Sequence, residues 1–414
     1  TPTYPIRPEQ PRTKPCEAYR PAHYILAAVL AFAALAAAQT GVTFPANRVP
    51  APQLPAPGPQ VSGTTWINSP PLSMKKLRGQ VVLVDFWEYT CINCIRTLAT
   101  NNAWYARYHD AGFTIVGVHD PEFDVAYLNS ADARRMLRDP EAAAAHSYGT
   151  SRLGNVAAAV RRFGMHYPVV VDDWFEIWNA YRNDSWPNRF LIDANGYVRY
   201  NVDGEGADAW LEGKIRELLH DAHPGRALPP PVVKTEDSAF APGCGVPTPE
   251  MYVGDWQGRG VLANREGYHD GRTVRYTLPG SVADGRVGLA GRWQTDMSGM
   301  IYRGHPQNGQ FPGQLKMRYH ARQLYAVLNV ARGRPERVYI QQDGHSLTAA
   351  DKGVDVKIDP AGRSYIDVDE ARLYYLVANP AFGAHDVLLL PSAPGLTVDS
   401  FTFGNNCQIS FPHL

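Results

Sequence analysis

Two cysteines separated by two residues follow a strongly apolar run in the stretch VVLVDFWEYTCINCIRTL. The run Val81–Trp87 predicts a buried strand, and the apolar periodicity of Cys91–Tyr108 predicts a helix that begins at the first cysteine. A structural zinc site needs four clustered Cys or His ligands, but the five cysteines of this chain include no second close pair. The pair Cys91 and Cys94 therefore predicts a redox centre, with an inert structural disulfide as the alternative.

The place of Cys91 at the start of a helix predicts that it is the nucleophile of the pair. Backbone N–H groups and the positive end of the helix point at a side chain in this position. The pKa of Cys91 is therefore expected to fall below that of a free cysteine. Cys94 lies one turn further into the helix and is expected to be more buried. Cys91 is then the attacking sulfur and Cys94 the resolving one.

The first 38 residues have the pattern of an export signal. Four basic residues precede an uninterrupted apolar run of 15 residues, Tyr24–Ala38. At helical rise this run spans about 22 Å, less than the roughly 30 Å of a bilayer core. It predicts a secretory signal peptide or, alternatively, a membrane anchor formed by residues 24–38. Both interpretations predict a periplasmic or other extracytoplasmic location for the rest of the chain.

Two proline-rich stretches, residues 39–62 and 224–243, are predicted linkers. Between them, strand and helix patterns alternate, so residues 63–223 are predicted to form an α/β domain with a mixed sheet. Short β-rich runs separated by Gly, Asn and Asp turns predict an all-β sandwich over residues 244–414. Basic and acidic residues are equal in number, at 40 each, so the charge does not predict binding to nucleic acid.

Longer motifs resemble a known family. The strand followed by Cys-x-x-Cys resembles the thioredoxin superfamily. The sequence is also similar to the exported region of the DipZ family of thiol–disulfide proteins, in motifs that include GVHDPEF, WNAYRNDSWPNRFLIDANGYVRY, TPEMYVG, LAGRW, RYHARQLYAVLN and FTFG. This resemblance covers nearly everything from Thr65 to Gly404. It implies a TlpA-like, thioredoxin-like α/β domain followed by a carbohydrate-binding-module-like, jelly-roll-like sandwich.

The resemblance also implies a role for Asp85, which lies six residues before Cys91 in the apolar strand. It would accept the proton of Cys94 when a mixed disulfide is resolved. Burial in an apolar strand is expected to raise the pKa of this carboxyl, which suits proton exchange near neutral pH. The alternative is an aspartate that caps a turn at the end of the strand.

The pair Trp186-Pro187 stands where the superfamily has a cis-proline that faces the cysteines. Both residues, together with Ile92 and Asn93 between the cysteines, are predicted to contact substrate. A cis X-Pro bond leaves the polar groups of the preceding residue free to pair with an extended peptide. An ordinary trans-proline at the start of a strand is the alternative.

Three further residues, Glu88, His119 and Glu122, are candidates for lining the redox site. Glu88 stands where the family usually has a small polar residue. If its carboxylate pointed inward, it would disfavour the Cys91 thiolate and make the pair more reducing, but outward solvation is the commoner fate of such a side chain. His119 and Glu122 lie at the end of a predicted strand, on the edge where sites of α/β domains form, and a packing or turn role is the alternative.

The remaining pair, Cys244 and Cys407, brackets the predicted sandwich and is a candidate structural disulfide. The first and last strands of a sandwich are often neighbours, and an oxidising compartment favours a bridge between nearby thiols. Two unpaired thiols, or exchange of one of them with Cys91, are the alternatives.

Together these features predict a periplasmic thiol–disulfide oxidoreductase that uses no cofactor or metal and acts on disulfide-containing protein substrates. The family's multi-helix membrane domain is not found in this sequence, so a separate membrane thiol-electron donor of CcdA or DsbD type is expected. A glycan is a candidate ligand of the sandwich domain. One alternative is a peroxiredoxin-like thiol peroxidase, although its Pro-x-x-x-Thr/Ser-x-x-Cys arrangement is missing before Cys91. The other is a non-enzymatic glycan- or protein-binding module on a thioredoxin scaffold.

Overall fold

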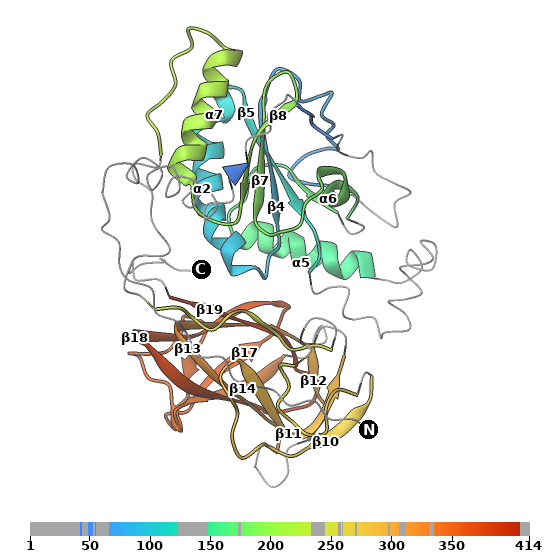
Figure 1. The fold of residues 1–414 in the computed structure, drawn as a ribbon, viewed down its shortest axis with the longest axis vertical. Helices are drawn as coiled ribbons and strands as arrows, with labels where there is room; N and C mark the ends of the chain where they lie inside the picture. Colours follow the sequence, from blue (N-terminus) through green and yellow to red (C-terminus); the bar gives the residue numbers. More distant parts are fainter. Residues whose placement is uncertain are drawn as a thin grey trace, which may run out of the picture.

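The structure is a computed structural model with two domains, an α/β domain and an all-β domain (Figure 1). It describes residues 42–43, 49–52, 54, 66–122, 148–172, 175–232 and, with short gaps, 245–405. The apolar run Tyr24–Ala38, Cys244 and Cys407 lie outside the described residues. Among the helices described, none is long and apolar enough to cross a membrane.

In the described residues, the α/β domain is built on a mixed sheet of eight strands in the order β1-β8-β7-β4-β5-β6-β3, with β2 also paired to β8. These strands are β1 (Val42–Thr43), β2 (Val49–Pro50), β3 (Trp66–Ile67), β4 (Val81–Trp87), β5 (Phe113–His119), β6 (Val169–Val171), β7 (Asn188–Ile192) and β8 (Tyr197–Asp203). The strand β5 runs parallel to both β4 and β6, whereas β7 runs antiparallel to β4 and β8. The predicted thioredoxin-like α/β fold with a mixed sheet is confirmed.

Helices cover both faces of this sheet (Figure 1). They are α2 (Ile92–Tyr108), the 3-10 helix η1 (His109–Ala111), α5 (Tyr148–Arg162), α6 (Glu176–Tyr181) and α7 (Asp208–Ala222). Along β4, Val81 and Leu83 pack in one cluster with α2, α5 and α7, while Val82 and Val84 pack in another with α6. All seven residues of β4 are buried because both faces are covered, which explains why the strand reads as a continuous apolar run.

The sheet also takes in segments that the sequence assigns to a linker. The short strands β1 and β2 pair with β8, and Leu54 is buried at 2% exposure. On the other side of the domain, Leu228 and Val232 pack against the core formed with α2 and α7. Parts of both proline-rich stretches therefore lie against the α/β domain.

In its described residues, the second domain is an antiparallel network of eleven strands around an apolar core. Its strands are β9 (Met251–Tyr252), β10 (Thr273–Tyr276), β11 (Arg286–Thr295), β12 (Met300–Tyr302), β13 (Gln314–Asn329), β14 (Glu336–Gln342), β15 (His345–Ser346), β16 (Lys357–Ile358), β17 (Ser364–Val368), β18 (Arg372–Pro391) and β19 (Thr397–Gly404). The first half of β13 pairs with β11 and its second half pairs with β19. On its other edge, β13 pairs with β18 along both halves. The predicted all-β domain is confirmed.

The two domains meet at the start of α2 (Figure 1). Ile92 and Ile95 of this helix form a buried apolar cluster with Tyr325, Val327 and Leu373 of the β domain. An ion pair between Arg162 and Glu370, at 2.6 Å, also joins the domains. The β domain therefore packs against the helix turn that carries the Cys-x-x-Cys motif.

The residues that flank Cys244 and Cys407 lie close together in the described part of the chain. The first strand described in the β domain, β9, pairs with the last one, β19. In addition, Asn405 Nδ2 donates a hydrogen bond of 2.6 Å to the carbonyl oxygen of Gly245. Both observations support the predicted disulfide.

We expect non-reducing peptide mapping of the chain produced in an oxidising compartment to recover one linked peptide that contains Cys244 and Cys407. The compartment is expected to be oxidising, and the flanking chains lie within hydrogen-bonding distance. Two freely alkylated cysteines, or a cross-link from either one to Cys91, would rule the bridge out.

Candidate active site

The two cysteines occupy the first turn of α2 in different environments. Cys91 is the N-cap residue, and its Sγ accepts a hydrogen bond of 3.3 Å from the backbone N–H of Cys94. Cys91 is half-buried, whereas Cys94 is fully buried. The predicted difference in burial is confirmed, and the half-exposed sulfur is the one placed to meet a substrate.

The predicted fall in the pKa of Cys91 is wrong. Burial raises the pKa of this thiol, and the hydrogen bond from the helix start offsets only part of the rise. The carboxylates of Glu122 and Glu250 raise this pKa further, because a negative charge opposes formation of a second one nearby. The helix terminus lowers the pKa of Cys91 as expected, but desolvation and the two carboxylates raise this pKa by more.

Asp85 lies fully buried on the face of β4 that α2 covers. Its Oδ2 accepts a hydrogen bond of 2.9 Å from Nδ2 of Asn101 in that helix, so it does not act as a turn cap. Burial raises the pKa of Asp85 to about 7, against the lowering effects of Arg189 and Asn101. The predicted rise in this pKa is confirmed, but the sequence did not indicate Asn101 or Arg189.

Cys94 is electrostatically coupled to both neighbours. Burial raises its pKa well above that of a free thiol, and its contacts with Cys91 and the charge of Asp85 add to the rise. Ionisation of both Cys94 and Asp85 is therefore unfavourable, because it would place two negative charges in the same buried site. The Asp85 carboxylate can act as the base for Cys94, because taking up the thiol proton removes the negative charge that opposes the Cys94 thiolate.

The peptide bond between Trp186 and Pro187 is cis, as predicted. The carbonyl oxygen of Trp186 lies 3.9 Å from Cys91 Sγ, so this backbone faces the half-exposed sulfur. The ring of Trp186 packs on that of Trp178, with 4.4 Å between the ring centroids.

The two residues between the cysteines point in different directions. Ile92 is buried at 4% exposure in the cluster between the domains, so it contacts the β domain. Asn93 is half-buried, and its Oδ1 accepts a hydrogen bond of 3.2 Å from Arg96. Arg96 also forms an ion pair of 3.2 Å with Glu205.

Glu88 is turned inward, so the expectation of outward solvation is wrong. Its side chain is 2% exposed, and its Oε1 lies 3.5 Å from Nε2 of His119. Its Oε2 accepts hydrogen bonds from the backbone N–H of Thr90, at 2.5 Å, and from the hydroxyl of Thr90. The ring of Tyr89 stacks on His119, with centroids 5.3 Å apart. These partners compensate for the burial of the carboxylate beside the redox helix.

Glu122 lies at the boundary between the domains. Its Oε1 accepts a hydrogen bond of 2.6 Å from the hydroxyl of Tyr252 in β9. Burial and the charges of Glu250 and Glu88 raise the pKa of Glu122 to about 8, against the lowering effect of Tyr252. The sequence predicted Glu122 but missed Tyr252 and Glu250, which lie about 130 residues further along the chain.

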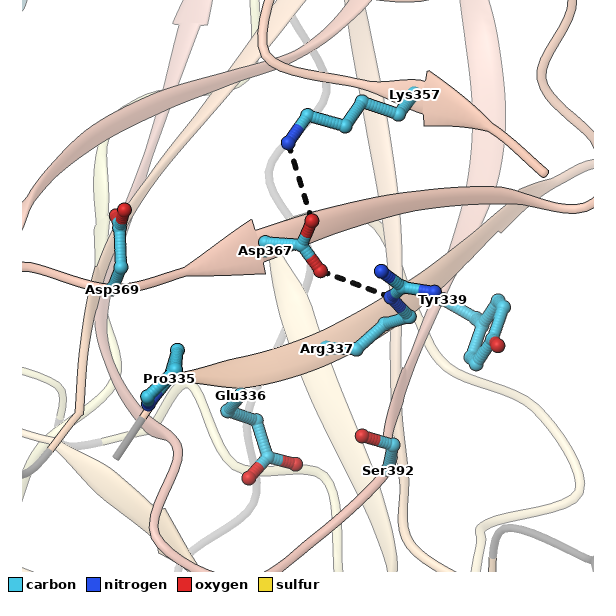
Figure 2. Close-up of a pocket in the computed structure, with 8 residues that line it drawn as sticks. All are labelled: Pro335, Glu336, Arg337, Tyr339, Lys357, Asp367, Asp369 and Ser392. Atoms are coloured by element: carbon cyan, nitrogen blue, oxygen red, sulfur yellow. Dashed lines mark hydrogen bonds and ion pairs between the residues drawn. The ribbon is translucent and has the colours of Figure 1, made fainter. Parts of the chain in front are cut away.

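A separate open pocket lies on the β domain (Figure 2). It is lined by Pro335, Glu336, Arg337, Tyr339, Lys357, Asp367, Asp369 and Ser392. Asp367 pairs with both Arg337, at 2.9 Å, and Lys357, at 3.2 Å, as Figure 2 shows. The Arg363 guanidinium covers one face of the Tyr339 ring, 4.5 Å from its centroid. One face of the Tyr339 ring is therefore covered and not available to stack on a sugar, and glycan binding stays a prediction.

Comparison with known proteins gives two family matches. Residues 248–404 match the family described as "Thioredoxin like C-terminal domain". Residues 51–201 match the AhpC/TSA family.

Several curated proteins are similar to the chain. It is 32% identical over 350 residues to Protein DipZ of Mycobacterium bovis and of Mycobacterium tuberculosis, which covers 84% of this chain and 42% of each relative. It is 24% identical to the thiol-disulfide oxidoreductase ResA of Bacillus anthracis, over 37% of this chain and 72% of that protein. A solved structure of a putative thiol:disulfide interchange protein DsbE from Chlorobium tepidum covers 42% of this chain and 96% of its own, at 21% identity and a TM-score of 0.31. The chain thus spans less than half the length of the DipZ relatives.

Proposed function

This chain is a homologue of Protein DipZ across 84% of its own length, and we propose that it is a thiol–disulfide oxidoreductase. One observation carries the proposal. The half-buried Sγ of Cys91 faces the backbone of Trp186, while Cys94 and Asp85 lie fully buried behind it. This arrangement separates an accessible attacking sulfur from a sheltered resolving sulfur with its own proton acceptor.

The reaction begins when the Cys91 thiolate attacks one sulfur of a substrate disulfide. The substrate S–S bond breaks, a mixed disulfide forms, and one substrate thiol leaves with a proton. Asp85 then accepts the proton of Cys94, and the Cys94 thiolate attacks Cys91 Sγ. The second substrate sulfur leaves as a thiolate, which takes up a proton to replace the one that Asp85 accepted, and the enzyme holds a Cys91–Cys94 disulfide. The backbone of Trp186 beside Pro187 would pair with an extended substrate segment, which places disulfide-containing proteins among the substrates.

The two raised thiol pKa values support a direction of electron flow from the enzyme to substrate disulfides. Strongly oxidising pairs stabilise their reduced form through a stable thiolate. Here burial raises the pKa of both Cys91 and Cys94, so the thiolate gains no such stabilisation. The pair is therefore a reductant of substrate disulfides. It works outside the cytoplasm and is recharged by a membrane thiol-electron donor of CcdA or DsbD type. A glycan stays the proposed ligand of the β domain, although the Arg363 guanidinium covers one face of the Tyr339 ring in its open pocket.

The test is reduction of insulin by the exported chain supplied with dithiothreitol, measured against dithiothreitol alone. We expect catalysed reduction. The match of residues 51–201 to the AhpC/TSA family favours a thiol peroxidase as the second candidate. Consumption of hydrogen peroxide without insulin reduction would support that candidate, and activity in neither assay would leave a binding module on a thioredoxin scaffold.

A further inference from the structure

The β domain meets the redox helix through one face of four neighbouring strands, β18, β13, β19 and β9. Opposite residues on these strands pair in the order Leu373, Val327, Ser400 and Tyr252. Directly opposite residues of a sheet project to the same face, so these side chains form one row. The next row contains Tyr375 opposite Tyr325, and their rings stack with 4.4 Å between the centroids. We call these two rows the interdomain face.

The interdomain face is not part of the core of the β domain. Along β13, Ala326 and Leu328 pack in that core, whereas Val327 between them projects to the other side of the sheet. Val327 is nevertheless only 3% exposed, because it packs in one cluster with Ile92 and Ile95 of the redox helix. A change at Val327 therefore acts on the contact between the domains and removes no side chain from the core of the β domain.

Two polar contacts fix the β domain in this position. The Arg162 guanidinium lies 2.6 Å from Glu370 of the β domain. The hydroxyl of Tyr252, which belongs to the interdomain face, donates a hydrogen bond of 2.6 Å to Glu122 of the redox domain. The apolar contact and these two polar contacts together hold the β domain against the start of α2.

This contact leaves the attacking sulfur open from one side among the described residues. Ile92 directly follows Cys91 and is buried by the interdomain face, so no substrate can pack on it there. Cys91 itself is half-buried, and its Sγ lies 3.9 Å from the carbonyl oxygen of Trp186. The chain before Trp186 is accessible, since Asp184 is exposed and Ser185 is half-buried. A substrate can therefore approach Cys91 along this segment.

We propose that the interdomain face determines which disulfides Cys91 can attack. It blocks the side of Ile92, so a substrate disulfide must arrive on a narrow, extended segment that runs along the Trp186 backbone. A disulfide on the rigid surface of a folded domain reacts slowly, because the surface around it collides with the β domain. This inference rests on the proposed oxidoreductase function and narrows its preferred substrates to disulfides in unfolded or extended chains.

Two probes with the same leaving group test the selectivity of the wild-type chain. One is a short peptide with a single cysteine, and the other is a folded carrier protein with a single cysteine in an exposed helix. Each cysteine carries a mixed disulfide with thionitrobenzoate. The Cys91 thiolate attacks the probe sulfur, the S–S bond breaks, and thionitrobenzoate leaves because its thiol has the lower pKa. Cys94 then attacks Cys91 Sγ and releases the probe thiol.

The absorbance of thionitrobenzoate gives each rate, which is divided by the rate of the same probe with dithiothreitol. This division removes differences in the intrinsic reactivity of the two probes. We expect the normalised rate for the peptide to exceed that for the carrier by about tenfold or more. Equal normalised rates would overturn the inference.

Val327→Asp tests whether the interdomain face causes this selectivity. A carboxylate is costly to bury against Ile92 and Ile95, so the contact should open. We expect the rate with the carrier to rise about tenfold and the rate with the peptide to change by less than about threefold. The peptide rate also corrects for any change in the reactivity of Cys91 itself. A wild-type ratio of the two rates in a folded Val327→Asp chain would contradict the inference.

Ile358→Asp is the matched control. It introduces the same charge into the same domain, but Ile358 lies in β16 and is 43% exposed. Its ratio of the two rates should equal that of the wild type, and a ratio lowered as much as in Val327→Asp would contradict a specific role of the interdomain face.

The wild-type comparison decides the inference even if Val327→Asp fails to fold. If the wild type reacts with neither probe faster than Cys91→Ser does, the proposed oxidoreductase function itself fails. If it reacts with both probes at equal normalised rates, that function stands and only the role of the interdomain face is lost.

Discussion

Replacement of Cys91 by serine is expected to abolish disulfide reduction, whereas replacement of Cys94 by serine should trap the enzyme on its substrate. Cys91 Sγ is the half-exposed sulfur that faces the Trp186 carbonyl, so without it no mixed disulfide forms. In Cys94→Ser the attack still occurs, but the buried resolving sulfur is missing. Insulin reduction measures the first effect, and non-reducing electrophoresis followed by mass mapping of the Cys91 peptide measures the second.

The two variants serve as controls for each other, because each removes one sulfur from the same helix turn. An adduct that accumulates in Cys91→Ser and not in Cys94→Ser would reverse the two assignments. Full activity of either variant would exclude a two-cysteine mechanism.

Asp85→Asn is expected to slow resolution of the mixed disulfide about tenfold or more above pH 7. The carboxyl of Asp85 has a pKa of about 7, so above that pH it is ionised and accepts the proton of Cys94. As the pH falls through 7, wild-type Asp85 becomes protonated, and the difference between wild type and variant should shrink. The second release of thionitrobenzoate from 5,5′-dithiobis(2-nitrobenzoate) reports this step separately from the first attack.

Glu336→Gln is the matched control for this prediction. Burial raises the pKa of Glu336 to about 7 as well, but this carboxyl lies in the β domain and accepts a hydrogen bond from the backbone N–H of Ala393. Its replacement should leave the second release unchanged at every pH. If Asp85→Asn shows the same pH profile as the wild type, Asp85 has only a structural role.

The sequence predicts the α/β domain well because its elements are locally encoded. The apolar runs at Val81–Trp87 and Phe113–His119 match β4 and β5 residue for residue. The turn at Gly196 that connects β7 to β8 is also locally encoded, since this glycine adopts a positive φ of 77° that other residues rarely take. Cys91 caps α2 where the pattern placed the start of the helix.

The β domain shows where local patterns are insufficient. The sequence suggests two short strands on either side of Arg322, but β13 runs through this point with a register shift between Ala321 and Gln323. Likewise β18 continues through the stretch with Pro380 and Gly383, which reads as a turn. A strand that bends at a bulge and changes partners has the same local composition as two strands with a loop between them.

The chemistry that the sequence missed depends on contacts between distant segments. Tyr252 reaches Glu122 across 130 positions, and no local signal pairs them. The same packing of the β domain against the start of α2 buries Ile92. The predicted fall in the pKa of Cys91 failed because the helix terminus is local, whereas the opposing burial and carboxylates come from the tertiary fold. Glu88 was misplaced for the same reason, since its partner His119 lies on the neighbouring strand.

The reduction potential of the Cys91–Cys94 couple decides whether the pair reduces or oxidises substrate disulfides. Equilibration of the full chain with dithiothreitol redox buffers, scored by alkylation of the two thiols, gives this value. Because burial raises the pKa of both thiols, we expect a two-electron couple with a potential at or below that of thioredoxin, about −270 mV. A value near about −120 mV, or cysteines that do not titrate as a pair, would contradict it.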